Sequence, residues 1–72
     1  MNLTETHPRE LAFRKQDGLQ VTLLWWEADN SLAVSVVDQP GADAFLVPVD
    51  GGQKPLDVFR HPFAHAARRG II

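Results

Sequence analysis

Three stretches in the middle of the chain alternate apolar and polar residues with a period of two, which is the pattern of a half-buried β-strand. They cover residues 19–26, 32–38 and 44–49. One side of these strands is almost wholly apolar, and we call it face A: Leu19, Val21, Leu23, Trp25, Leu32, Val34, Val36, Phe45, Val47 and Val49. We expect face A to carry the sheet's part of the core, which consists of Val21, Leu23, Trp25, Val34, Val36, Phe45 and Val47.

Turn residues between the stretches predict how the strands pair. A two-residue turn at Asp29-Asn30 and a four-residue loop through Pro40-Gly41 are the connections that their composition favours. These two turns predict the following cross-strand pairs: Trp25–Val34, Leu23–Val36, Val36–Phe45 and Val34–Val47. Both turns keep the apolar positions on face A, so the sequence predicts an antiparallel meander.

The opposite side, which we call face B, is mixed: Gln20, Thr22, Leu24, Trp26, Ala33, Ser35, Val37, Leu46 and Pro48. Neighbouring strand side chains point to opposite faces, so Trp25 enters the core and Trp26 lies on face B. Large apolar side chains gathered on a surface mark contact sites for partners. We therefore predict an interface at Leu24, Trp26, Val37, Leu46 and Pro48. The alternative is that the N-terminal segment, with Leu11 and Phe13, folds over them.

Residues 11–15 predict a further strand, joined to residues 19–26 through Asp17-Gly18, a strong hairpin signal. A two-residue turn pairs Phe13 with Thr22 and Leu11 with Leu24, on face B. A three-residue loop with a bulge at Gly18 slips the register and sends Phe13 to face A. The sequence leaves both registers open, and the sheet has three or four strands.

The C-terminal run from Pro55 has apolar residues at helical spacing, which predict a helix packed on face A through Leu56, Phe59, Phe63 and Ala66/Ala67. Pro62 cannot donate a backbone hydrogen bond and disfavours helical geometry at His61. It predicts either a kink or a second helix that starts at Pro62. The predicted fold class is α+β: an antiparallel meander of three or four strands with one kinked C-terminal helix packed on face A. A flexible tail is predicted over residues 1–9 and a single domain over residues 10–72.

Composition narrows the function. Seven basic residues against nine acidic ones give a net charge of −2, whereas nucleic-acid binding usually needs a basic footprint. The predicted register offers face B only Lys15 and Arg9 as cations. The chain has no cysteine, which excludes disulfides and thiolate metal sites and fits a reducing compartment. The first 15 residues lack an apolar signal segment and no run is long enough to span a bilayer, so we expect a cytoplasmic protein.

Asp57, His61 and His65 recur every four residues, a spacing that would put three metal ligands on one face of a straight helix. The break at Pro62 falls between Asp57 and His65, so we expect His65 to be solvated and assign no metal or cofactor. The segment Gly51-Gly52-Gln53-Lys54 lacks the pattern of a phosphate loop and reads as a plain turn. Ser31 and Ser35 have no histidine partner, and no catalytic residue is assigned.

The segments 21–25 (VTLLW) and 56–67 (LDVFRHPFAHAA) resemble a group of small actinobacterial proteins that have no established activity. The likeness covers roughly residues 19–70, and its most distinctive part is the L-D-x-F-x-H-P-[FY]-A-x-A-A element. An aromatic residue, often Tyr, takes the position of His65 in that group. The resemblance implies a bacterial cytoplasmic protein and no mechanism.

These observations favour a small non-enzymatic protein-interaction module, a homodimer or an accessory subunit, that docks through the face with Trp26. The alternative is a nucleic-acid-binding sheet laid in a major groove, as β-sheet readers do. The third hypothesis is a small enzyme or a metal protein.

Overall fold

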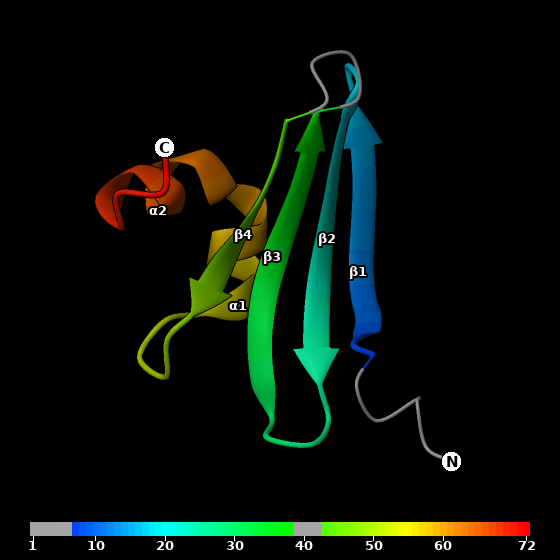
Figure 1. Cartoon of the computed structure of the whole chain (residues 1–72), viewed down its shortest axis with the longest axis vertical. Coiled ribbons are helices and arrows are strands. Elements are labelled where there is room, and N and C mark those ends of the chain that lie inside the picture. The colour runs from blue at the N-terminus through cyan, green and yellow to red at the C-terminus, as the bar shows by residue number, and fades with distance from the viewer. Residues whose placement is uncertain (1–6, 39–42) are drawn as a thin grey trace.

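A four-stranded antiparallel meander forms the body of the computed structural model, which describes residues 7–38 and 43–72. Its elements are β1 (Arg9–Gln16), β2 (Leu19–Trp26), β3 (Ser31–Asp38), β4 (Asp43–Val49), α1 (Pro55–Arg60) and α2 (Pro62–Arg68). Both helices lie on the same side of the sheet (Figure 1). The α+β prediction is confirmed, with four strands. Strand β1 begins at Arg9, so the predicted tail is one residue too long, and its residues 1–6 lie outside the described residues.

The β1–β2 hairpin turns through Asp17 and Gly18, which have φ of 53° and 85°. Positive φ at both central residues is what a type I′ turn requires. The two-residue register is therefore the right one, and Phe13 pairs with Thr22. The predicted partner of Leu11 is wrong: Glu10 pairs with Leu24 and Ala12 with Leu23, so Leu11 is the extra residue of a β-bulge.

Strands β2 and β3 are joined by a four-residue loop, residues 27–30, and not by the predicted two-residue turn. Trp25 pairs with Leu32 and Leu23 with Val34, so the predicted partners Val34 and Val36 are wrong. Asn30 has a φ of 59° and its Oδ1 accepts a hydrogen bond from Trp25 Nε1 at 2.7 Å, which holds a four-residue turn. A slip of two residues keeps every side chain on its face, because the side-chain period of a strand is two.

The β3–β4 pairing is as predicted, with Val36 opposite Phe45 and Val34 opposite Val47. The predicted loop residues Pro40-Gly41 lie outside the described residues.

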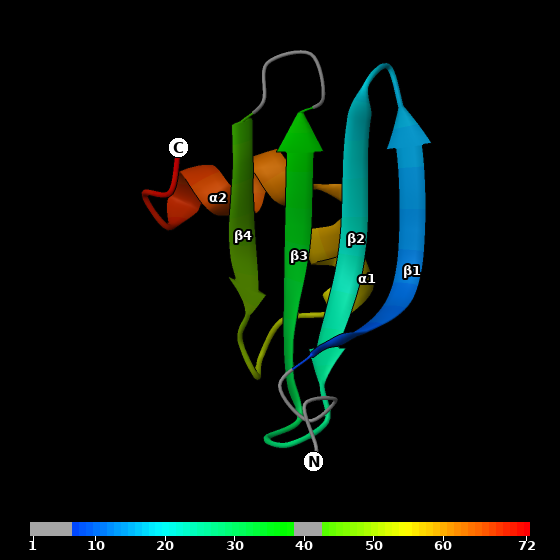
Figure 2. The same cartoon turned by 45° about the vertical axis from the view of Figure 1, so that its right-hand side comes forward.

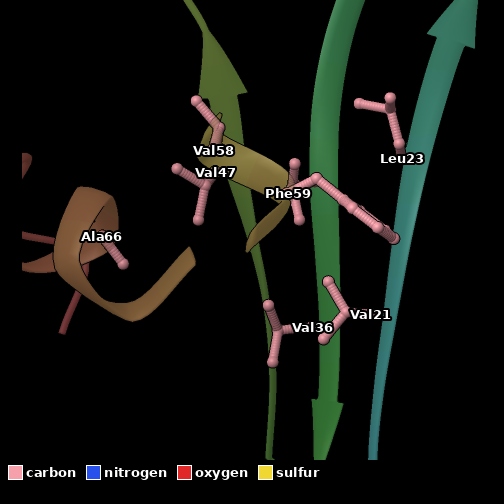
Figure 3. Packing of buried hydrophobic residues seen from close by; sticks show 8 residues of the cluster. Val21, Leu23, Val36, Val47, Val58, Phe59 and Ala66 are labelled. Carbon is pink, nitrogen blue, oxygen red and sulfur yellow. The ribbon is translucent and has the colours of Figure 1, made fainter. Parts of the chain in front are cut away.

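The core lies between face A and the two helices (Figure 3). It consists of Val21, Leu23, Val34, Val36, Val47, Val58, Phe59 and Ala66. Of the predicted core residues, Trp25 and Phe45 are only half-buried. Leu56 and Phe63 are wrong as core residues, since they are 52% and 44% exposed.

Helix α1 ends at Arg60 and α2 begins at Pro62, so the chain forms two helices and not one kinked helix. His61 has a φ of −129°, and its N–H donates to Asp57 O at 2.9 Å. Pro62 then takes the first position of α2, where no intrahelical donor is needed. The two helices bury one stripe of residues at helical spacing, rotated from the predicted one. Helix α1 buries Val58 and Phe59 in place of Leu56, and α2 buries Pro62, His65 and Ala66 in place of Phe63. None of the helices in the described ranges is long and apolar enough to cross a membrane.

Candidate interaction surface

Face B looks away from the helices (Figure 2). The strand register arranges its side chains in rows that run across the sheet from β1 to β4. These rows are Lys15–Gln20–Val37–Ala44, Phe13–Thr22–Ser35–Leu46 and Glu10–Leu24–Ala33–Pro48, followed by the pair Trp26–Ser31. Each of the four strands therefore presents an apolar side chain on this face.

The apolar residues of face B differ in how much of each meets solvent. Phe13 is 54% exposed and Leu46 is 49% exposed. Pro48 is also exposed, whereas Leu24, Trp26 and Val37 are half-buried. Ala33 is buried although it lies on this face, because it sits in its row between the larger side chains of Leu24 and Pro48.

The N-terminal strand extends face B along the edge of β2, and its start crosses over the end of β2 on that face (Figure 2). Strand β1 pairs edge to edge with β2 and turns Phe13 outward beside Thr22, and Leu11 is 53% exposed. Arg9, at the start of β1, pairs with Trp25, so the crossing lies at the end of β2 that carries Trp26. Phe13 lies opposite Thr22, two rows away from Trp26, and Trp26 itself is half-buried.

The strand positions of face B carry two charges, and both belong to β1. Glu10 lies opposite Leu24, and Lys15 lies opposite Gln20. Their sequence separation is odd, so a regular strand would put them on opposite faces. The bulge at Leu11 brings them to the same face, a feature that the sequence pattern does not reveal.

Strand β1 also supports the helices from the other face. Arg14 lies on face A, and its Nη2 donates to Phe59 O at 3.1 Å and to Arg60 O at 3.4 Å. Its guanidinium lies 5.4 Å from the centre of the Phe59 ring. A cation at the last carbonyls of a helix is favourable, so Arg14 ties the edge strand to the end of α1. Sequence reasoning missed this role, although the two-residue register places Arg14 on face A.

Among the described residues of the helix side, His65 is the buried polar side chain, and it is only 6% exposed. The predictions that it is solvated and that Pro62 separates it from Asp57 are wrong. The break lets α2 pack against α1, so His65 Nε2 lies 2.8 Å from Asp57 Oδ2, and its Nδ1 lies 3.4 Å from Gln53 Nε2. The tautomer with a proton on Nε2 satisfies both contacts.

The same network closes the loop that leads into α1. Gln53 Oε1 accepts a hydrogen bond from Asp50 N at 2.9 Å, Gln53 N donates to Asp50 O, and the Asp50 carboxylate pairs with Arg69. The hydrogen bond from His65 lowers the pKa of Asp57 below its ordinary value. These hydrogen bonds hold the loop, α1 and α2 together, so the role of the network is structural.

Of the three candidate metal ligands, Asp57 and His65 are brought together and His61 is not. His61 is exposed, and no group of three or more metal-ligating side chains occurs in residues 7–38 and 43–72. Ser31 bonds Asp29, and its hydrogen bonds lower the pKa of that carboxyl. Ser35 lies on face B, across the sheet from His65.

An open hollow of about 390 Å³ lies where the sheet meets α2 and the C-terminal residues. Its apolar lining includes Phe45, Phe63, Ile71 and Ile72, with Asp38 as the charged member. The rings of Phe45 and Phe63 meet edge to face with their centres 5.6 Å apart.

No family model, curated protein or solved structure matches the chain. The resemblance to the actinobacterial group therefore stays a prediction.

Proposed function

We propose that this chain is a small non-enzymatic protein-interaction module of the cytoplasm that binds its partner through face B. The observation that carries the proposal is the one-sided placement of the helices, which leaves apolar side chains of all four strands on the other side. Phe13 and Leu46 are about half exposed there, at opposite ends of the row Phe13–Thr22–Ser35–Leu46. The half-buried Leu24, Trp26 and Val37 add apolar surface to the same face, and apolar surface on one side of a domain is typical of contact sites.

The polar groups of the helix side support a binding role over catalysis. Both ring nitrogens of His65 are engaged, by Asp57 and by Gln53, which leaves neither free to act as a base. Lys15 is the single cation among the described strand positions of face B. One cation is too few for nucleic-acid binding, because binding to a phosphate backbone depends on several cations.

The test uses two substitutions of the same kind on opposite sides of the molecule. Leu46→Glu adds a charge to face B, and Leu56→Glu adds one to α1, at leucines that are 49% and 52% exposed. Immobilised wild-type and variant chains are used to capture proteins, this chain included, from an extract of the producing cells. Circular dichroism checks that each variant is folded.

We expect one defined protein to bind the wild type and Leu56→Glu and to be lost with Leu46→Glu. Capture that Leu46→Glu leaves unchanged, or that both variants lose equally, contradicts the use of face B. The same material in a gel shift at low salt tests nucleic-acid binding.

A further inference from the structure

Face B has a charge pattern that complements itself. Glu10 and Lys15 lie on β1 near opposite ends of the face, and the other described strand positions of the face are uncharged. We consider two copies stacked through face B and related by a two-fold axis that lies in the plane between the sheets and runs across the strands. This rotation lays β1 of one copy antiparallel over β1 of the other. It sets Glu10 of each copy against Lys15 of the other. We propose that the partner of face B is a second copy of this chain, packed face to face; this inference rests on the proposed function.

The same rotation matches side-chain sizes across the interface. It exchanges the row of Lys15 with the row of Glu10, because these rows flank the row of Phe13 on either side. Ala33 then faces Val37 of the second copy, and Ala44 faces Pro48. A small residue meets a larger one in each case, which is how the inner faces of stacked sheets interdigitate.

The area of the face suits a reversible dimer. Four strands at ~4.8 Å spacing and three to four rows along them span roughly 19 by 23 Å, or about 450 Å² per copy. The pair then covers about 900 Å², which is below the ~1,200 Å² of stable specific interfaces and in the range of transient ones. We therefore expect a weak, reversible dimer, whose dissociation constant depends on the quality of the contacts and not on the area.

The sheet edges are poor alternatives for self-association. The bulge at Leu11 interrupts β1, and Arg9, Arg14 and Lys15 add positive charge to this edge. Bulges and charges are devices that prevent the pairing of edge strands. On the other edge, Pro48 has no N–H to offer a neighbouring strand.

Sedimentation equilibrium of charge variants tests the proposed geometry. Glu10→Lys and Lys15→Glu each place like charges together in the dimer, and each is expected to raise the dissociation constant about tenfold. The double variant Glu10→Lys/Lys15→Glu restores both pairs and returns the constant to within about threefold of the wild type. An equimolar mixture of the two single variants forms a heterodimer. Failure of both the double variant and the mixture to recover overturns the proposal.

Leu46→Glu distinguishes a face-to-face dimer from a dimer that pairs along the β1 edge. Leu46 lies on β4, three strands away from β1, so an edge-paired dimer would not contact it. We expect Leu46→Glu to abolish the dimer and Leu56→Glu to leave it intact. A dimer that survives Leu46→Glu overturns the face-to-face arrangement. A wild type that stays monomeric at 8.0 kDa across a concentration series overturns the inference of a second copy. The proposed function still stands in that case if another protein is captured by the wild type and lost with Leu46→Glu. If that capture is absent too, the proposed function falls with it.

Discussion

Val58→Ala tests how α1 is rotated against the sheet. Val58 is completely buried in the core, so the substitution removes two buried methyl groups, at about 1.6 kcal/mol of transfer free energy. A residual cavity adds up to about 1 kcal/mol, and alanine's better helix propensity returns about 0.5 kcal/mol. We expect a net loss of about 2 kcal/mol of unfolding free energy.

Leu56→Ala is the matched control on the same helix. It removes one more carbon atom than Val58→Ala does, but Leu56 is 52% exposed. We expect it to cost less than about 1 kcal/mol. The apolar periodicity of the sequence alone, which places Leu56 in the core, predicts the opposite order.

Urea unfolding followed by tryptophan fluorescence measures both variants, because Trp25 and Trp26 lie in β2. Thermal unfolding gives an independent value, with a midpoint lowered by about 8–16 °C for a loss of 2 kcal/mol in a domain of this size. A loss for Leu56→Ala that equals or exceeds that for Val58→Ala would refute the placement of α1.

Three further predictions concern the helix network, the strand clamp and the hairpin turn. The folded-state pKa of Asp57 is lowered, so its contribution to stability is present above the ordinary value and is lost as the pH falls through the folded pKa. Asp57→Asn should therefore lower the urea midpoint at pH 6, with a deficit that shrinks toward pH 3; a deficit independent of pH would contradict this linkage. Arg14→Met loses two hydrogen bonds to helix carbonyls and should cost about 1–2 kcal/mol in the same assay, whereas its exposed neighbour on face A, changed as Gln16→Met, should cost less than about 0.5 kcal/mol. Gly18→Ala puts a side chain at a φ of 85° and should lower the thermal midpoint through a loss of about 1 kcal/mol or more. Gly51→Ala, where a methyl group meets nothing within 4 Å, should be close to neutral, and equal effects of the two would argue against the type I′ turn.

The register of the sheet shows how far local patterns reach. Asp17-Gly18 predicts a hairpin but leaves two registers open, and the positive φ of both residues in the structure selects the one that pairs Phe13 with Thr22. The predicted two-residue turn at Asp29-Asn30 is two residues shorter than the observed loop. The loop's length depends on the hydrogen bonds from Trp25 to Asn30 and from Ser31 to Asp29. The faces were still right, because a slip of two leaves the alternation intact.

The helix region shows where local patterns fail. Pro62 predicts a break, but the rotation of α1 and α2 about their axes depends on packing against the sheet. That rotation buries Val58 and His65 and exposes Leu56 and Phe63. It also brings Asp57 to His65 across the break, a contact that a straight-helix reading cannot anticipate.

The sequence by itself determined the three central strands, the alternation of their faces, the β3–β4 pairing and an interruption of the helix at Pro62. These features depend on backbone chemistry and on the period of a strand, and both are local. The tertiary structure alone decided the bulge at Leu11, the rotation of the two helices and the burial of His65. Each of these depends on how distant elements fill the space over one face of the sheet, and the same packing leaves face B without a helix over it.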